Sequence, residues 1–265
     1  MDSKRWEEDL QLALVMADQV DALTMSRFRA DDLEVNDKPD LTPVTDADRS
    51  AEHMIRTQLS HSRSRDAVVG EEEGSSGYAS RRWVIDPIDG TSNFLRGVPV
   101  WATLIGLMEE GRMVVGVASA PALGCRWWAA AGSGAWTGRS RSSARQIHVS
   151  KIRTLEQASF SYSEIGEWAE AKRLRGFMNL SQQVWRTRAY GDFWSYMLVA
   201  EGVVDIASEP ELNLWDMGAL YPIVTEAGGH FTGLDGTDGV KGPGAVVTNG
   251  RLHSQVLDLI GSPTD

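Results

Sequence analysis

Residues 83–94 read Trp-Val-Ile-Asp-Pro-Ile-Asp-Gly-Thr-Ser-Asn-Phe, and the rest of the chain is best interpreted outward from this stretch. Its apolar start suits a buried strand that delivers Asp86 to a loop. Because Pro87 stiffens the turn, Asp86, Asp89 and the Ile88 carbonyl between them can point to one place. Carboxylate and carbonyl oxygens are the donors that a hard cation prefers, so the stretch predicts a metal site.

The residues that follow suit a phosphate. Gly90 lets the backbone approach a ligand closely. From Thr91 onward the chain can begin a short helix, whose free N–H groups and positive dipole end would hold an anion. Taken alone, the same residues also fit an ordinary turn with Asp and Thr side chains capping a helix. The surrounding acidic segments decide between the two interpretations.

Three further acidic segments accompany the stretch. They are Val44-Thr45-Asp46-Ala47-Asp48, Gly70-Glu71-Glu72, and Trp215-Asp216 at the start of a helix that ends at Gly228-Gly229. Converging carboxylates raise one another's pKa values and repel, so such a cluster makes little sense without cations. The oxygen-only donors and the scattered histidines favour magnesium over zinc. The histidines are expected to lie on the surface or in packing positions: His53, His61, His148, His230 and His253.

The set resembles the inositol-monophosphatase-like family of metal-dependent phosphatases. Gly70-Glu71-Glu72, residues 83–94 and residues 215–229 stand in the order and approximate spacing of its three signatures. The resemblance covers nearly the whole chain. It implies an α+β or α/β fold, a layered αβαβα sandwich forming a single unit over 1–265. A half at about 1–150 would carry most metal ligands, and a half at about 151–265 would carry substrate recognition.

The resemblance also implies roles for single residues. One Mg²⁺ would bind Glu71, Asp86 and the Ile88 carbonyl, and a second would bind Asp86, Asp89 and Asp216. A third, weaker ion would lie between Glu71 and the phosphate, giving two to three ions per site. Asp48 and Thr91 would orient the attacking water, and Gly90 with Thr91 would bind the phosphate. Phosphoryl transfer mainly requires charge neutralisation and in-line positioning, which two ions about 4 Å apart can supply.

The substrate is predicted from the second half. Residues 185–193 and 207–211, together with 38–48 and 96–101, resemble the histidinol-phosphate phosphatases of the family, which act in histidine biosynthesis. This likeness implies hydrolysis of L-histidinol phosphate, with Arg188, Gly191, Asp192 and Glu209 beside the leaving group. The two carboxylates suit a cationic alcohol, although Asp192 also fits as a helix cap. Inositol 1-phosphate and other small sugar or nucleotide phosphates stay open, because related folds change substrate through a few pocket residues.

Two alternatives come from other classes. Haloacid-dehalogenase-type phosphatases use Asp-x-Asp-Gly-Thr near the N-terminus, whereas Asp86 and Asp89 are three residues apart and lie far along the chain. A non-catalytic, metal-binding relative is the other alternative. The complete set of Glu71, Asp86, Asp89, Thr91 and Asp216 disfavours it.

The composition limits the classes of molecule that this chain is expected to bind. The chain has 265 residues, 37 acidic against 26 basic, and a formal charge of −11, which disfavours a nucleic-acid or anionic-membrane surface. The N-terminus at 1–8 has no basic segment leading into an apolar run, so a cytoplasmic protein is expected. The single cysteine, Cys125, excludes an intrachain disulfide and is expected to be buried. With nucleic acid and membranes disfavoured, the expected partner is the small phosphate ester that the resemblance implies.

Periodicity predicts the elements. Helices are expected at 6–28, after Thr45-Asp46, and at 167–180, 192–201, 216–227 and 252–260, and strands at 158–162, 204–207 and 245–248. Residues 98–136 predict an antiparallel meander, and 31–43 a polar connector with an extended piece. The apolar meander, together with the usual assembly of the family, leads us to expect a homodimer.

Overall fold

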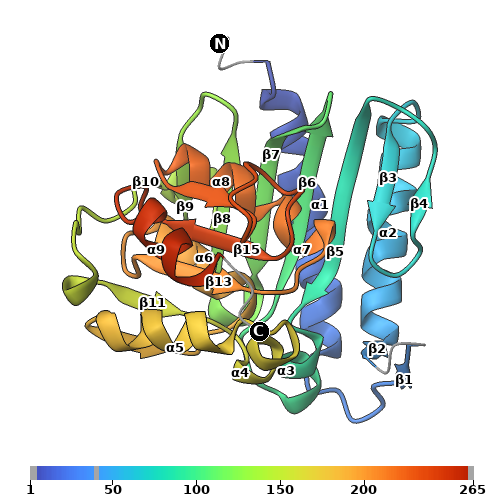
Figure 1. Ribbon diagram of the computed structural model, residues 1–265. Helices are drawn as coiled ribbons and strands as arrows, with labels where there is room; N and C mark the ends of the chain where they lie inside the picture. The colour runs from blue at the N-terminus through green and yellow to red at the C-terminus, as the bar shows by residue number, and fades with distance from the viewer. Residues whose placement is uncertain (1–4, 39–41, 262–265) are drawn as a thin grey trace.

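Helices and sheets alternate in layers in the computed structural model, which describes residues 5–38 and 42–261 (Figure 1). The helices of that part are α1 (Glu7–Arg27), α2 (Asp46–Ser62), α3 (Thr91–Arg96), α4 (Ile165–Glu170), α5 (Leu174–Gln183), α6 (Asp192–Ala200), α7 (Leu214–Gly218), α8 (Leu220–Glu226) and α9 (His253–Ile260). The strands are β1 (Val35–Asp37), β2 (Pro43–Thr45), β3 (Ala67–Gly70), β4 (Ser75–Ser76), β5 (Arg81–Asp89), β6 (Ala102–Glu109), β7 (Arg112–Ala120), β8 (Cys125–Ala130), β9 (Ala135–Thr137), β10 (Arg145–Ile147), β11 (Ser159–Ser161), β12 (Arg186–Arg188), β13 (Ile206–Glu209), β14 (His230–Thr232) and β15 (Ala245–Thr248).

The larger sheet contains the predicted meander. Within the described residues its eight strands run in the order β10-β9-β8-β7-β6-β5-β3-β4. Neighbours from β5 to β10 are antiparallel, which confirms the meander, whereas β3 runs parallel to β5. Nearly every residue of β6 and β7 is buried, because α1 and α2 cover one face of the sheet and α7 and α8 the other (Figure 1). The apolar residues of these two strands are thus covered within the chain and give no support for the homodimer, which stays a prediction.

The smaller sheet completes the sandwich. In the described part its five strands run in the order β12-β11-β13-β15-β14, with β11 parallel to both of its neighbours. Helices α6 and α8 lie between the two sheets, and α4, α5 and α9 cover the outer face, where Phe160, Phe177 and Val256 form a core. The expected αβαβα sandwich is confirmed.

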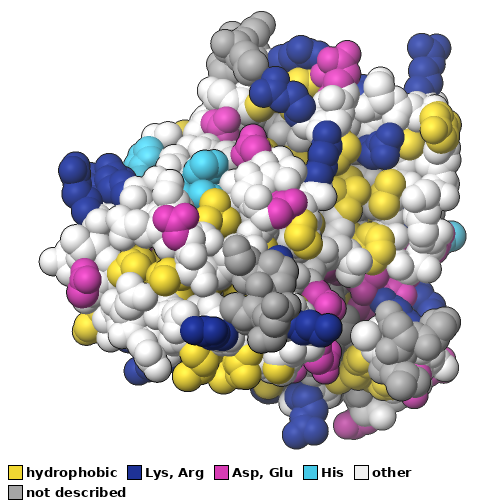
Figure 2. All heavy atoms as spheres, in the orientation of Figure 1, with side chains coloured by type: hydrophobic (Ala, Val, Ile, Leu, Met, Phe, Trp, Pro, Cys, Tyr) yellow, Lys and Arg dark blue, Asp and Glu magenta, His cyan; other side chains and the backbone are white. Residues whose placement is uncertain are grey.

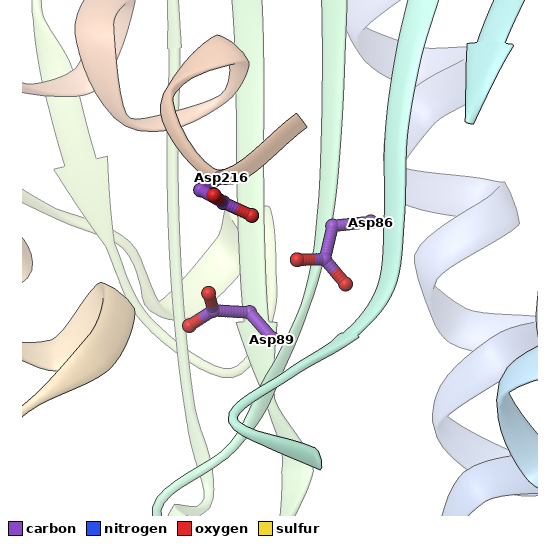
Figure 3. A group of neighbouring side chains, drawn as sticks. All are labelled: Asp86, Asp89 and Asp216. Carbon is purple, nitrogen blue, oxygen red and sulfur yellow. The ribbon is translucent and has the colours of Figure 1, made fainter. Parts of the chain in front are cut away.

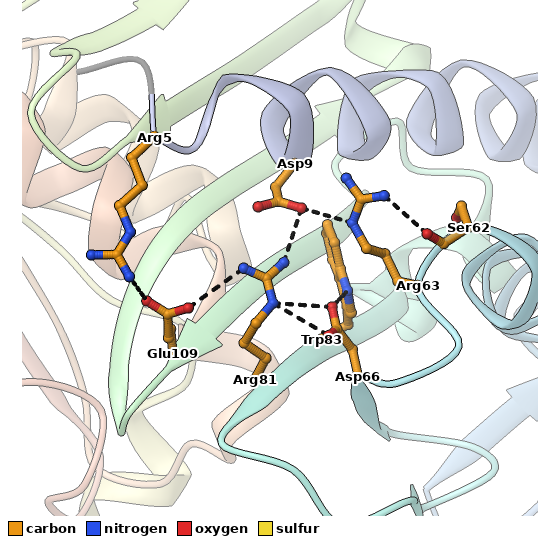
Figure 4. A network of polar contacts seen from close by, with 8 residues as sticks. All are labelled: Arg5, Asp9, Ser62, Arg63, Asp66, Arg81, Trp83 and Glu109. Carbon is orange, nitrogen blue, oxygen red and sulfur yellow. Dashed lines mark hydrogen bonds and ion pairs between the residues drawn. The ribbon is translucent and has the colours of Figure 1, made fainter. Parts of the chain in front are cut away.

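A polar network fastens β5 to the helices beside it (Figure 4). Asp9 of α1 accepts from Arg63 at 2.9 Å and from Arg81 at 3.0 Å. Asp66 accepts from the Trp83 indole at 3.0 Å and pairs with Arg81 at 3.3 Å. Charge-assisted hydrogen bonds of this kind are stronger than neutral ones. They fix the beginning of β5, and its other end carries the aspartates of the signature.

Two predicted helices are each divided into two. The helix expected at 167–180 is interrupted between α4 and α5, where Lys172 has a left-handed backbone with φ 56°. The helix expected at 216–227 forms as α7 and α8, divided at Ala219. Pro222 explains this division, because proline lacks an N–H and its ring collides with the carbonyl four residues earlier.

The predicted burial of Cys125 is wrong. Its side chain is exposed, because it begins β8 directly after the turn at Gly124, and burial starts one residue later. Trp127 and Trp128 of the same strand are buried. Some expectations fall outside the described residues: 1–4 of the N-terminal segment and 39–41 of the connector. Within the described part, no helix combines the length and apolar character needed to cross a bilayer.

Candidate active site

A β-bulge in β5 brings the two signature aspartates to one side. Asp86 pairs with Leu104 of β6, but Asp89 pairs with Ala102, so three steps along β5 face two along β6. In a regular strand, residues three apart point to opposite faces. The extra residue re-aims the second carboxylate, and Pro87 suits such a position because it has no N–H to pair.

The third aspartate comes from α7. Asp216 lies in the first turn of that helix, where its Oδ2 accepts the Asn213 backbone N–H at 2.6 Å. This capping bond holds the side chain toward β5. Figure 3 shows Asp86, Asp89 and Asp216 pointing toward one another, and one oxygen from each lies within 4.8 Å of the others. The two oxygen-bearing segments, distant in sequence, thus form one acidic centre.

The acidic centre is electrostatically unfavourable by itself. The pKa of Asp86 lies well above its usual range because of burial first and then the charges of Glu71 and the other two aspartates. The pKa of Asp89 is raised for similar reasons: burial, then Asp192 and Asp216. The pKa of Asp216 rises to about 7, again mainly through burial. Asp86 Oδ1 is buried without a hydrogen-bond partner. An orphaned buried carboxylate oxygen is costly unless a cation lies near it.

Glu71 lies at the rim of this centre, just after β3. Its backbone N–H donates to the Ile85 carbonyl at 3.2 Å, and its carboxylate pairs with Lys38 at 2.6 Å. Lys38 also pairs with Glu72 at 2.7 Å, and burial raises the pKa of Glu72 to about 7. Sequence analysis missed Lys38, since a lone lysine in a polar connector carries no distinguishing pattern. It supplies a positive charge beside the carboxylates of Glu71 and Glu72.

Asp48 and Thr91, the two residues expected to orient the attacking water, are hydrogen-bonded to each other. Asp48 is fully buried in the first turn of α2, where its Oδ2 accepts the backbone N–H and the hydroxyl of Thr45 at 2.8 and 2.5 Å. Its other oxygen accepts the Thr91 hydroxyl at 3.3 Å, and that hydroxyl also lies 3.0 Å from the Ile88 carbonyl. The capping box of α2 therefore fixes Asp48 beside the residue that begins α3.

Asp192 bridges the two halves of the chain. Its carboxylate accepts from Asn93 at 2.8 Å, and a Cβ on Gly90 would lie 3.3 Å from its Oδ2. Its backbone is left-handed, with φ 47°, a conformation that costs a residue with a side chain about 1–3 kcal/mol. The α6 helix has no side-chain cap, so the capping role considered for Asp192 is wrong. The next N–H, of Phe193, donates to Asp89 at 2.8 Å.

Glu209 ends β13 and is 5% exposed. Its Oε2 accepts from Ser163 at 2.7 Å, while its Oε1 is buried without a partner. Burial and then the charge of Asp192 raise the pKa of Glu209 to about 8 against the opposing effect of Ser163. Burial and the Glu164 charge raise the pKa of Asp192 to about 6. Glu209 is thus a buried acceptor, and the Tyr196 hydroxyl also lies near its carboxylate.

Further carboxylates surround Glu209. Burial raises the pKa of Glu167 to about 7, and the charges of Glu164, Glu211 and Asp192 raise it further. We call the group the acidic wall; it comprises Glu164, Glu167, Asp192, Glu209 and Glu211. Asp and Glu side chains also gather on the lower half of the face shown in Figure 2. The acidic wall extends the negative region from the aspartate cluster onto α4 and β13.

Two of the residues predicted to bind the substrate, Arg188 and Gly191, have no side-chain contact with the acidic centre in the described part of the chain. Arg188 is exposed at the end of β12, and its guanidinium donates to the Thr187 carbonyl. Gly191 has φ 80° and precedes α6, where it allows the turn into the strained Asp192. Ser163, which donates to Glu209 and accepts the Asp192 N–H at 3.0 Å, was missed because serine in a loop gives no signal in sequence.

The chain resembles known proteins in both sequence and fold. Histidinol-phosphatase from Streptomyces coelicolor is 61% identical over 257 residues, spanning 96% of this chain and 97% of the relative. Histidinol-phosphatase from Mycobacterium tuberculosis is 53% identical over 256 residues, spanning 96% of this chain and 98% of the relative. Among solved structures, the extragenic suppressor protein suhB from Bartonella henselae superposes with a TM-score of 0.87 at 27% identity, covering 96% of this chain and 98% of that one.

An IMPase from Thermotoga maritima superposes similarly, with a TM-score of 0.85 at 28% identity and 96% of each chain covered. Residues 5–262 match the sequence profile of the Inositol monophosphatase family. The match includes the acidic signatures on β5 and α7 and the loop after β3. From sequence profile, fold and site together, the chain belongs to the inositol monophosphatase family of phosphoric monoester hydrolases.

Proposed function

We propose that this protein is a magnesium-dependent histidinol-phosphatase, which hydrolyses L-histidinol phosphate to L-histidinol and phosphate. The observation that carries the proposal is the convergence of Asp86, Asp89 and Asp216 within 4.8 Å, next to an acidic wall on the leaving-group side. The two relatives at 61% and 53% identity, both named histidinol-phosphatase, support the choice of substrate.

The donors fit a hard divalent cation. They are oxygens alone, one of them is buried without a partner, and their mutual repulsion requires positive charge. Asp86, Asp89 and Asp216 would hold one Mg²⁺, and Glu71 with Asp86 and the Ile88 carbonyl another, with a third beside Glu71. When bound, the ions would supply charge neutralisation at the phosphate and a lowered pKa for the attacking water.

The chain's own groups position the reactants. The Thr91 hydroxyl donates to Asp48 or to the Ile88 carbonyl, which leaves an oxygen lone pair for a proton of the attacking water. Asp48 can receive a proton through Thr91, since burial raises its pKa. At the start of α3, Gly90 and Thr91 contribute first-turn N–H groups, which lack acceptors inside a helix and can bind phosphate.

The acidic wall suits the leaving group. Histidinol carries an ammonium and an imidazole, and both favour carboxylate partners. Ser163 connects Asp192 and Glu209, because its hydroxyl donates to the Glu209 carboxylate and accepts the Asp192 backbone N–H. A cationic alcohol would lower the electrostatic cost of this wall, whereas inositol would leave its charges uncompensated. Inositol 1-phosphate is therefore the second candidate. Family membership excludes the haloacid-dehalogenase class. Measured turnover would exclude a non-catalytic relative.

Measurement of released phosphate tests the proposal. L-Histidinol phosphate, inositol 1-phosphate and an aryl phosphate are compared with excess Mg²⁺ and with EDTA. We expect histidinol phosphate to have the highest kcat/KM, no turnover in EDTA, and full recovery with added Mg²⁺. A higher kcat/KM for inositol 1-phosphate would overturn the substrate, and turnover in EDTA would overturn the metal. We also propose a cytoplasmic homodimer that acts in histidine biosynthesis.

A further inference from the structure

A glutamate outside the acidic centre holds the loop that carries Glu71. Glu52 lies on α2 and is fully buried. Its Oε2 accepts the backbone N–H of Glu72 at 2.7 Å, and its Oε1 accepts that of Glu73 at 3.0 Å. A carboxylate that binds two successive N–H groups fixes the main chain between them. The anchored residues follow directly after Glu71.

Gly70 shows how closely this carboxylate approaches the loop. A Cβ built on Gly70 would lie 2.1 Å from Glu52 Oε1 and 2.4 Å from its carboxyl carbon. These distances are far inside van der Waals contact, so any side chain at position 70 would displace Glu52. The backbone of Gly70 is not left-handed, which means that the close approach, and not its φ angle, requires glycine here.

Arg56 completes the arrangement one turn along α2. Its Nε donates to Glu52 Oε1 at 2.7 Å, and its Nη1 donates to Ser76 at 3.0 Å. Its Nη2 donates to the Gly74 carbonyl. Arg56 thus balances the buried charge of Glu52 and also binds the loop between β3 and β4. In Figure 1 α2 runs along these two strands.

We propose that Glu52 is a positioning residue that orients Glu71 toward the metal centre. Glu71 is fastened before and after: its own N–H donates to the Ile85 carbonyl, and the next two N–H groups donate to Glu52. Asp48 lies four residues before Glu52 on the same face of α2. One helix therefore sets both the water-orienting Asp48 and the loop of Glu71. This inference rests on the proposed metal site.

Isothermal titration of the metal-free protein with Mg²⁺ tests this role without relying on activity. In Glu52→Gln, one amide oxygen replaces two acceptors and the NH₂ group faces a donor. We expect the Mg²⁺ dissociation constant to rise about 10- to 100-fold, the usual effect of losing a partner that orients a metal ligand. Saturating Mg²⁺ should recover most of kcat. The matched control is Asp205→Asn, another buried carboxylate that accepts a backbone N–H, from Ser159 at 2.7 Å.

We expect Asp205→Asn to lower Tm but leave Mg²⁺ affinity unchanged. Unchanged affinity in folded Glu52→Gln would overturn the inference, whereas a wild-type protein that binds no Mg²⁺ would overturn the metal site itself. If Glu52→Gln does not fold, Gly70→Ala provides the second test, because its methyl group displaces the same carboxylate. Gly70→Ala should weaken Mg²⁺ binding by a similar factor, and equal affinity to wild type would again refute the role of Glu52.

Discussion

Replacing Asp216 by asparagine should stabilise the metal-free protein while abolishing activity. Burial and the charge of Glu71 raise the pKa of this carboxyl from 3.8 to about 7. The folded state then binds a proton that the unfolded state has released between about pH 4 and 7, so the stability of the wild type falls as pH rises through this range. Above about pH 7 the folded state has also released this proton, and the protein has lost the whole of this contribution to stability. Asparagine carries no charge, and its side-chain oxygen can still accept the Asn213 N–H.

The size of the effect follows from the shift. A rise from 3.8 to about 7 corresponds to roughly 4 kcal/mol at 1.36 kcal/mol per pKa unit. Asp216 is partly exposed and shares its protons with coupled neighbours, so about half of this figure, ~2 kcal/mol, is the expected gain. For a chain of this length, that corresponds to an increase in Tm of about 4–8 °C at pH 8.

Thermal unfolding in EDTA at pH 5 and pH 8 measures this gain. The wild type should lose stability between the two values, Asp216→Asn should lose less, and Mg²⁺ should stabilise the wild type more than the variant. The contrasting control is Asp9→Asn, because Asp9 lies between Arg63 and Arg81 and its removal should destabilise at pH 8. A less stable Asp216→Asn protein at pH 8 in EDTA would refute the electrostatic reasoning.

Four further outcomes are expected. Asp192→Asn and Glu209→Gln should each reduce kcat/KM for histidinol phosphate roughly 10- to 100-fold, through loss of a charge-assisted hydrogen bond of about 1.5–3 kcal/mol, but should affect an aryl phosphate little. Equal losses on both substrates would show that Asp192 and Glu209 do not determine specificity. Asp89→Asn should stay folded by circular dichroism yet be nearly inactive, and substantial turnover would contradict its role as ligand. Hydrolysis of a chiral phosphate ester should invert the phosphorus, because water attacks directly; a trapped aspartyl-phosphate at Asp86 would contradict this. Light scattering at micromolar concentration should give a dimer, and a monomer would overturn the expected assembly.

Local patterns in the sequence were sufficient for much of the architecture. The apolar run before Asp86, the meander and the helices α1 and α2 could be predicted, because strand and helix periodicities are properties of consecutive residues. The divided helices could not be predicted with the same ease. Lys172 adopts a left-handed backbone for which lysine gives no signal. Pro222 does signal an interruption, but proline is also accepted in the first turn of a helix, so the residue alone does not tell where the second helix begins.

The acidic segments could also be recognised in the sequence, but their mutual geometry could not. The β-bulge in β5 decides that Asp86 and Asp89 share a side, and it arises from pairing with β6. The bond from the Phe193 N–H to Asp89 and the ion pair of Lys38 with Glu71 join segments from different layers. The exposure of Cys125 likewise depends on where β8 leaves the turn.

The sequence by itself determined which residue types were present for metal and phosphate chemistry, since that chemistry depends on short runs of carboxylates, glycine and threonine. Only the tertiary structure decided how they act together. Glu52 illustrates the difference: in sequence it is one more polar residue of an amphipathic helix, but packing of α2 against the loop places its carboxylate where a Cβ of residue 70 would lie. The physical reason is that hydrogen bonds and charge interactions depend on distance in space, which consecutive residues do not encode.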